Sequence, residues 1–266
     1  MKTRHTLGIL SFLLLISACA SSPTGRNQLI LVSDAQMNQM GAASFQAMSQ
    51  EQKAISSGPE FDYVRCIADA ILSADGRDPL AWEVKVFADD SPNAFALPGK
   101  KIGVHTGMIK LSKNADQLAA VMGHEIGHVD ARHGAERVSL SMTSQLAQQA
   151  TTILLEGQEY QSTALAALGL GAQYGVLLPY SRTHESEADT IGLYLMAKAG
   201  FDPAQAIELW REMKKASGGS APPEFMSTHP SNETRIKELT EELAHANGVY
   251  LSAVKEGKAP GCRRPN

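Results

Sequence analysis

The sequence predicts an α+β fold that is mainly α-helical and contains one small antiparallel sheet. Apolar residues recur at helical spacing over most of the chain, whereas a period of two is confined to residues 82–106. The chain has 266 residues, of which 43% are hydrophobic, so it is long enough to bury a full hydrophobic core. Because no internal repeat is present, residues 29–266 are expected to form one domain.

The first 18 residues are typical of an export signal. Lys2 and Arg4 give a positively charged start, and an apolar run follows from Leu7 to Ala18. This run is too short to span a bilayer comfortably. Residues 1–18 are therefore predicted to be a signal peptide and not part of the folded protein.

The signal ends in Ile16-Ser17-Ala18-Cys19, which resembles a bacterial lipobox. Cleavage of such a signal leaves a lipidated cysteine, so Cys19 is predicted to carry a lipid anchor and residues 19–28 to include a polar tether. Because no aspartate follows Cys19, the resemblance favours the periplasmic side of the outer membrane. The alternative is an ordinary secretory signal with an incidental cysteine.

Charge and cysteine content give two further expectations. The net charge of −4 gives no support for nucleic-acid binding. With Cys19 lipidated, Cys66 and Cys262 remain, and an even pair in an oxidising compartment suggests a disulfide. That bond would tie the C-terminal tail to an early helix. Two separate thiols are the alternative.

Two helices are predicted before residue 80. Ser33-Asp34-Ala35-Gln36 has the form of a capping box, from which a helix should run to about residue 50. Apolar residues between Phe61 and Ser73 recur at helical spacing, which predicts a second amphipathic helix. Residues 75–79 are rich in Asp, Gly and Pro and form a turn.

The small sheet is predicted from the next segment. Residues 82–88 alternate as a strand does, and residues 93–97 and 102–106 flank Pro98-Gly99-Lys100-Lys101, which predicts a hairpin. An exposed strand at this position could bind an extended peptide by adding it to the sheet edge. The candidate edge consists of Asn93, Ala94, Phe95 and Ala96.

The rest of the chain is predicted to be helical. Residues 138–178 are too polar for a membrane span, and their glycines favour a helical hairpin, either as packing helices or as a lid over the active site. A flexible loop is expected at residues 217–223. Helices are expected at about residues 183–199, 203–217 and 230–247.

The segment His124-Glu125-Ile126-Gly127-His128 carries the strongest chemical signal. It follows an apolar segment without proline, for which Asn114 offers an N-cap, so it should lie on a helix. Residues four apart share a helix face, so His124 and His128 can bind one metal ion. Glu125 can then reach a water on that metal as a general base. This arrangement predicts one catalytic zinc ion per chain, which needs a third protein ligand.

Two positions in the sequence could supply the third ligand. His133 follows His128 without an intervening glycine, so on a continuing helix it would point away, as a surface or second-layer histidine. Glu185 and Asp189 are four apart and share a helix face. Glu185 can bind the metal while Asp189 orients a ligating imidazole through its free N–H. The alternative is a solvated acidic helix start.

Four motifs together resemble a known family. They are Pro23-Thr24-Gly25-Arg26-Asn27-Gln28-Leu29, Asn93-Ala94-Phe95-Ala96-Leu97-Pro98-Gly99, the His-Glu-x-x-His segment, and Glu185-x-x-Ala188-Asp189. The family is that of gluzincin metallopeptidases related to HtpX and the CAAX prenyl proteases, especially the periplasmic BepA-like and LoiP-like lipoproteins. The resemblance implies a thermolysin-like zincin core with added helices, and Glu185 as the ligand.

Thr228-His229-Pro230 followed by Arg235-Ile236 also resembles a motif of the BepA-like group. The resemblance implies that His229 approaches the zinc from a mobile loop. It would be either a transition-state donor or a fourth ligand that blocks water, and a structural turn is the plain alternative. Arg182 is a further candidate for stabilising an oxyanion.

The function expected from these residues is that of a zinc metalloendopeptidase, with His124, His128 and Glu185 as ligands and Glu125 as general base. The resemblance implies an enzyme anchored to the outer membrane that degrades misfolded or stalled envelope proteins. The main alternative is a periplasmic chaperone or assembly factor for outer-membrane proteins, whose site His229 keeps closed. A structural zinc lipoprotein is a weaker alternative, because a structural site has no use for Glu125.

Overall fold

The computed structural model describes residues 19–155, 180–216, 224–229 and 233–265. The predicted signal at residues 1–18, residues 156–178 of the segment 138–178, and the loop at residues 217–223 lie outside the described residues. Within the described part of the chain, no helix combines the length and the hydropathy needed to cross a membrane.

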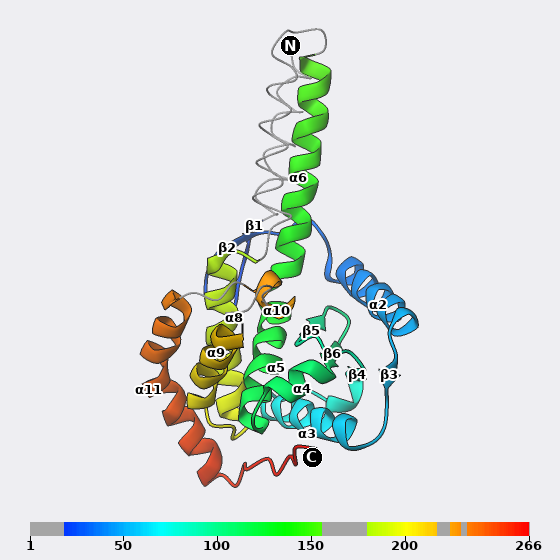
Figure 1. Cartoon of the computed structure of the whole chain (residues 1–266). Coiled ribbons are helices and arrows are strands. Elements are labelled where there is room, and N and C mark those ends of the chain that lie inside the picture. Colours follow the sequence, from blue (N-terminus) through cyan, green and yellow to red (C-terminus); the bar gives the residue numbers. More distant parts are fainter. Residues whose placement is uncertain (1–18, 156–179, 217–223, 230–232, 266) are drawn as a thin grey trace. The chain divides into compact units, whose positions relative to one another are not determined.

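The described chain is mainly helical, and the predicted α+β class is confirmed (Figure 1). Its helices are α2 (Asp34–Glu51), α3 (Pro59–Ala74), α4 (Thr106–Leu111), α5 (Ala115–Asp130), α6 (His133–Leu154), α8 (Arg182–Lys198), α9 (Ala204–Ala216), α10 (Glu224–Thr228) and α11 (Glu233–Lys255), with a short 3₁₀ helix η1 (Pro79–Ala81). Its strands are β1 (Cys19–Ser21), β2 (Asn27–Leu29), β3 (Ala54–Ile55), β4 (Glu83–Phe87), β5 (Ala94–Leu97) and β6 (Lys101–His105).

The chain separates into two compact units. One unit consists of residues 1–37 and 130–178, and the other of residues 38–129 and 179–266. The predicted helices near residues 34–50, 61–73, 183–199 and 203–217 are confirmed. The last helix continues past its expected end to Lys255, and Ala253 in this extension is buried.

In the first unit, the segment expected to be a polar tether is folded. Strands β1 and β2 form an antiparallel hairpin that pairs Ala20 with Gln28. Arg26 donates two hydrogen bonds to the Glu136 carboxylate of α6, at 2.9 and 2.7 Å. The amide of Gln28 is buried and donates to the carbonyl of Ala131 at 2.6 Å. The polar motif near residue 26 is therefore explained by its packing against the start of α6.

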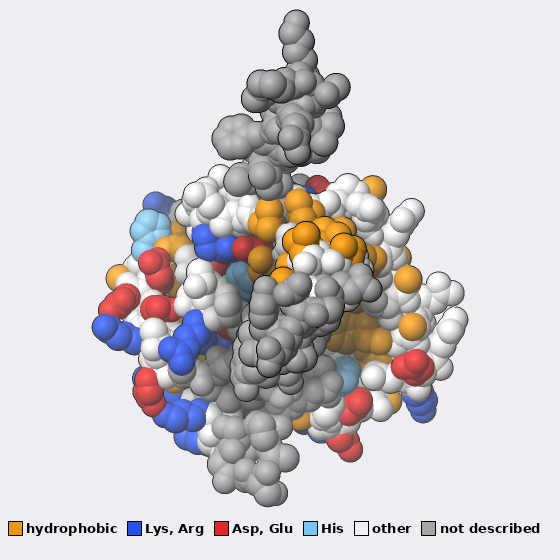
Figure 2. Space-filling model, turned by 90° about the horizontal axis from the view of Figure 1, so that it is seen from above, with side chains coloured by type: hydrophobic (Ala, Val, Ile, Leu, Met, Phe, Trp, Pro, Cys, Tyr) orange, Lys and Arg blue, Asp and Glu red, His pale blue; other side chains and the backbone are white. Residues whose placement is uncertain are grey.

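Helix α6 carries both a small core and an exposed apolar side. Val32, Met37 and Ala135 form a buried cluster near its start. Farther along, large apolar side chains are exposed at Met142, Leu146, Ile153 and Leu154. Figure 2 shows hydrophobic side chains gathered on one face of the described chain.

The second unit contains a four-stranded sheet with the order β3-β4-β6-β5. The predicted hairpin is confirmed, because β5 and β6 pair antiparallel, with Ala94 opposite Val104. The sheet is nevertheless mixed and not purely antiparallel: β4 and β6 are parallel neighbours. The connection after β4 passes to the far side of β6, so β5 lies at an edge of the sheet, as expected for the strand of Asn93–Ala96.

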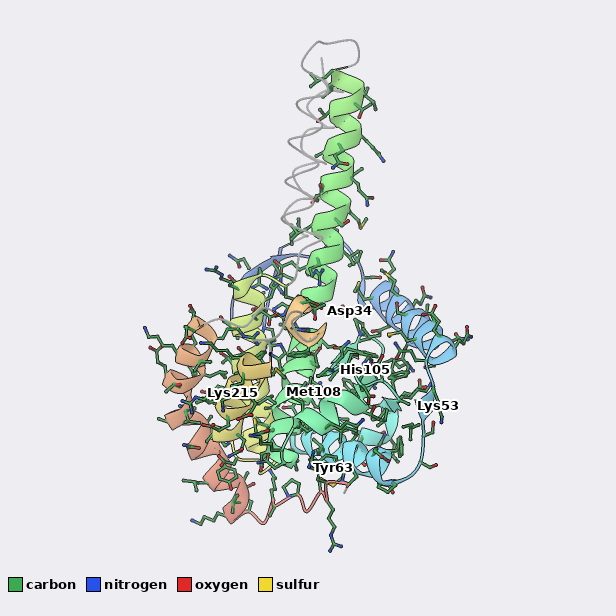
Figure 3. The ribbon with its side chains drawn as sticks, in the orientation of Figure 1. Asp34, Lys53, Tyr63, His105, Met108 and Lys215 are labelled. Atoms are coloured by element: carbon green, nitrogen blue, oxygen red, sulfur yellow. A yellow bond between two sulfur atoms is a disulfide. The ribbon has the colours of Figure 1, made fainter. Side chains whose placement is uncertain are left out.

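Helices cover this sheet and enclose the core. Helix α3 packs against it with an apolar face that includes Ile67 and Ile71, both fully buried. Figure 3 shows Tyr63 of α3 and Met108 of α4, which are buried in the same core. A disulfide joins Cys66 on α3 to Cys262 in the C-terminal tail, the pair expected from the sequence.

Candidate active site

The site depends on a close crossing of α5 and α8. Gly123 and Gly127 lie one turn apart on α5, and Ala188 and Gly192 lie one turn apart on α8. A Cβ added to Gly127 would lie 2.8 Å from the carbonyl oxygen of Ala188, and one added to Gly192 would lie 2.6 Å from the amide nitrogen of His124. The small residues inside both sequence motifs therefore let the two backbones approach closely enough for α8 to present Glu185 to the histidines of α5.

Three predicted ligands come together at this crossing. The Nε2 atoms of His124 and His128 are 3.0 Å apart. The Glu185 carboxylate lies with Oε1 at 3.4 Å from His128 Nε2 and Oε2 at 3.7 Å from His124 Nε2. All three side chains are buried. Two imidazole nitrogens and a carboxylate that face one point are a typical donor set for zinc.

His229 adds a fourth ligand atom, and the third nitrogen, to this group. One ligand atom from each of His124, His128, Glu185 and His229 lies within 4.8 Å of the others. His229 Nε2 and Glu125 Oε1 are 3.5 Å apart and buried, and neither atom has a hydrogen-bond partner in the described structure. Buried polar atoms without partners are rare, and a cation with its bound water would satisfy both. The residues present therefore fit a zinc ion.

Asp189 is placed to orient one of the ligands. Its Oδ1 lies 2.9 Å from His124 Nδ1, so a proton on Nδ1 leaves the Nε2 lone pair for a metal. Burial lowers the pKa of His124, which favours the neutral form that binds metal. Burial also acts to raise the pKa of Asp189, but the charge of Arg235 and hydrogen bonds from Arg235 and His124 outweigh it and hold that pKa at about 2.

Arg235 is the largest of the fully buried side chains and lies within the same network. It donates to both carboxylate oxygens of Asp189, from Nε at 2.6 Å and from Nη2 at 2.7 Å. Its Nη1 lies 2.6 Å from Glu185 Oε2. The guanidinium lies over the ring of Trp210, 3.8 Å from the ring centroid. One side chain of α11 thus contacts two carboxylates of α8.

Glu125 lies in an environment that favours its protonated form. Burial, together with the charge of Glu185, raises the pKa of Glu125 well above its ordinary value. The backbone N–H of Ala96 opposes this shift by hydrogen-bonding to the Glu125 carboxylate. A bound cation would also oppose it, because a positive charge stabilises the ionised carboxylate. Glu125 is therefore suited to holding a proton and giving it up.

His229 is held by aromatic contacts on the element that carries it. Its ring stacks on Phe225 with centroids 4.3 Å apart and an angle of 17° between the planes. Its Nδ1 faces the hydroxyl of Thr228 at 2.9 Å, which leaves Nε2 toward Glu125. Burial, followed by the charges of His124 and Arg235, lowers the pKa of His229 well below its ordinary value. The imidazole is therefore neutral at pH 7.

Other expected positions have different surroundings. His133 is buried at the start of α6 and not on the surface, because the chain does not continue as one helix: Arg132 between α5 and α6 has a left-handed φ of 55°. His133 is not part of the four-residue metal group found in the described chain. The side chain of Arg182 is exposed at the start of α8. This position does not support the suggested role in stabilising an oxyanion.

Several residues of the site were not assigned a role from the sequence. Tyr180 stacks on His128 with centroids 4.0 Å apart, and its backbone N–H donates to the carbonyl of Thr228. Trp210 and Phe225 lie around His124 with centroids near 6 Å (6.0 and 6.1 Å). Isolated aromatic residues carry no spacing signal, so only the fold could reveal them. Arg235 belongs to a sequence motif, but the sequence alone does not reveal which side chains it contacts.

Comparison with known proteins gives a match over most of the chain. Residues 60–243 match the model of peptidase family M48. The mitochondrial metalloendopeptidase OMA1 of Schizosaccharomyces pombe is 40% identical over 193 residues, which cover 69% of this chain and 53% of the relative. The β-barrel assembly-enhancing protease of Escherichia coli is 30% identical over 181 residues, which cover 65% of this chain and 37% of the relative. The chain thus spans about half the length, or less, of these relatives.

These relatives correct the expected location. The OMA1 proteins of S. pombe and Saccharomyces cerevisiae, at 40% and 36% identity, are named as mitochondrial, whereas the bacterial relative is more distant at 30%. The prediction of a lipid-anchored protein on the periplasmic side of the outer membrane is therefore wrong by this comparison. It depended on the resemblance of a short segment ending at Cys19, and residues 1–18 lie outside the described structure.

Proposed function

Because the chain belongs to peptidase family M48, we propose that it is a zinc metalloendopeptidase that cleaves unfolded or misassembled proteins. The metallopeptidase class follows from the family, and the finer function rests on the site. The observation that supports it most is the group of two histidines and one glutamate, with Glu125 and its buried Oε1 beside them. A structural metal site does not need such a carboxylate.

His124, His128 and Glu185 would hold the metal, and Asp189 would fix the proton on His124 Nδ1. When bound, a zinc ion supplies a positive charge that acidifies a water molecule and polarises the scissile carbonyl. The neutral state of His124, favoured by its burial, agrees with this role, because a protonated imidazole cannot be a ligand.

Glu125 would take a proton from the attacking water and pass it to the leaving amine. Burial and the charge of Glu185 raise the pKa of Glu125, whereas the Ala96 N–H and a bound cation would lower it, so the carboxyl group can both accept and release a proton. His229 would serve as a hydrogen-bond donor to the oxygen that gains charge in the transition state when its proton is on Nε2, which in the neutral ring requires Nδ1 to accept from the Thr228 hydroxyl. His229 Nε2 and Glu125 Oε1 lie 3.5 Å apart, so the two groups would act on the same reacting atoms.

The edge strand would hold the substrate as an extended peptide. Asn93 accepts a hydrogen bond from the backbone N–H of His105 on β6 at 2.9 Å, so the backbone groups of Ala94 and Ala96 turn away from β6. A strand added at this edge would run beside Glu125, since Ala96 itself contacts that carboxylate. Only an unfolded segment can add in this way, which supports non-native proteins as substrates.

The test is to measure zinc content and cleavage of unfolded casein in one preparation of the purified protein, beside the Glu125→Gln variant. We expect about one zinc per chain in both, and cleavage in the parent alone, reduced at least about 100-fold in the variant. Equal cleavage by parent and variant would exclude Glu125 as the base. A parent without zinc would exclude the metal site.

A second candidate function is a closed, largely inactive form that acts as a chaperone or assembly factor. It is supported by the ligand atom of His229, which lies within 4.8 Å of those of the other three residues and could take the fourth position on the metal. His229→Ala separates the two candidates: faster cleavage favours a blocking ligand, and slower cleavage favours a transition-state donor. A chaperone activity that survives Glu125→Gln would favour the second candidate.

A further inference from the structure

We infer that Arg235 is the positioning residue of the metal centre: one guanidinium fixes the ligand carboxylate of Glu185 and, at the same time, the carboxylate of Asp189 that orients His124. This inference rests on the proposed zinc site. Arg235 lies on α11, 111 residues away from His124 in sequence. The inference gives this residue a direct part in positioning the metal ligands.

Arg235 distinguishes the two oxygens of Glu185. Its Nη1 lies 2.6 Å from Oε2, which is the distance of a close ion pair. The other oxygen, Oε1, is turned toward His128 Nε2 at 3.4 Å. With Oε2 engaged by Arg235, Oε1 is the oxygen presented to a metal. Arg235 would thus favour a one-oxygen contact and keep a position open for water.

Arg235 and His124 share one carboxylate oxygen of Asp189. Asp189 Oδ1 lies 2.7 Å from Arg235 Nη2 and 2.9 Å from His124 Nδ1. The second oxygen of Asp189 is held by Arg235 Nε at 2.6 Å. A carboxylate held at both oxygens cannot rotate, so the direction of the His124 ring is fixed through Asp189. Lysine could not reproduce this two-point contact, because it offers a single nitrogen.

Arg235 also balances buried charge and is held rigidly. Glu125, Glu185 and Asp189 are buried carboxylates, and Arg235 with a divalent cation would balance their three negative charges. Trp210 lies against the guanidinium at 3.8 Å and is itself buried, so Arg235 has one stable orientation. A group that only joined two helices would not need contacts with both a ligand and the partner of another ligand.

The competing explanation is that Arg235 merely ties α11 to α8. The chain offers a matched control, because Tyr194 of α8 donates a hydrogen bond to Glu242 of α11 at 2.6 Å. Tyr194→Phe removes a contact between the same two helices without touching any residue of the metal group. Arg235→Lys keeps the positive charge but removes the two-point contact.

The experiment measures zinc affinity of the full-length protein by competition with a chromophoric chelator, and the visible spectrum of the cobalt-substituted protein. Circular dichroism confirms that each variant is folded. We expect Arg235→Lys to bind zinc about 10- to 100-fold more weakly than the parent, and to have shifted cobalt bands at saturating metal. Tyr194→Phe should match the parent in both measurements.

A folded Arg235→Lys variant with the affinity and the cobalt spectrum of the parent would overturn the inference. So would equal losses in Arg235→Lys and Tyr194→Phe, since these would indicate helix packing alone. If Arg235→Lys does not fold, the charge-balanced double variant Asp189→Asn/Arg235→Gln gives the same readout, and parental affinity there would overturn the inference. A parent that binds no zinc is a different result, because it refutes the proposed site itself.

Discussion

The backbone N–H of Ala96, on the edge strand β5, is hydrogen-bonded to the carboxylate of Glu125 on α5. This contact joins the strand expected to bind substrate to the residue expected to move the proton. It is possible because Ala96 lies opposite Ile102 in the ladder with its backbone groups turned away from β6. Substrate position and proton position are thereby set relative to one another.

Replacing Ala96 by proline should impair catalysis without unfolding the sheet. Proline removes the N–H that contacts Glu125 but breaks no bond to β6, because this N–H faces the edge. The pKa of Glu125 should then rise further, so the acid limb of the kcat/KM profile should move to higher pH, and activity at pH 7 should fall about tenfold or more. Ala94→Pro is the control: it also faces the edge, and it should leave the acid limb in place.

The close crossing of α5 and α8 predicts that Gly192→Ala weakens zinc binding. The new Cβ would lie 2.6 Å from the amide nitrogen of His124, so the helices must separate, at a cost of about 1–3 kcal/mol in the free energy of unfolding. Gly248→Ala on α11 is the control, because nothing lies within 4 Å of its added Cβ. That variant should gain about 0.5–1 kcal/mol and keep its zinc affinity. Urea unfolding and zinc competition measure both effects, and a stable Gly192→Ala with parental affinity would contradict the prediction.

The raised pKa of Glu125 predicts that the free energy of unfolding of the metal-free protein depends on pH. Because its pKa is raised above the ordinary value of 4.5, the folded state keeps a proton at pH values where the unfolded state has lost it. Unfolding then releases a proton. The contribution of Glu125 to the free energy of unfolding is therefore complete below pH 4.5 and is lost as the pH rises through the folded-state pKa. Glu125→Gln lacks this dependence.

The measurement for this prediction is the urea midpoint of chelator-treated parent and Glu125→Gln at several pH values from 4 to 8. The variant should gain stability relative to the parent as the pH increases. The comparison cancels the opposite contributions of His124 and His229, whose pKa values are lowered in both proteins. A difference between the two proteins that does not change with pH would exclude a raised pKa for Glu125.

The disulfide between Cys66 and Cys262 should stabilise the protein without being needed for zinc binding. The cysteines are 196 residues apart, and crosslinks that close long loops typically contribute about 2–4 kcal/mol. The tail has a further attachment, because Arg264 donates to the carbonyl of Lys110 at 3.2 Å. A Cys66→Ala/Cys262→Ala variant should therefore unfold at lower urea concentration and still bind one zinc. Loss of zinc binding in a folded variant would show that the tail supports the site.

The sequence alone determined the elements whose signals are local. The spacing of His124, Glu125 and His128 identified the metal helix, and alternation identified the hairpin that includes Ala96, because side-chain periodicity is a property of a single element. The family resemblance then singled out Glu185. None of these signals reveals how far apart two elements lie.

The tertiary structure decided the relations between elements. The mixed order of the sheet, the contact between Ala96 and Glu125, and the convergence of Glu185 and Asp189 on Arg235 join segments distant in sequence. A buried arginine has no periodic signal, and its partners are fixed only when helices α8 and α11 pack together. The sequence thus determined the chemistry of the site, whereas packing decided its geometry, because close approach of two backbones depends on every side chain between them.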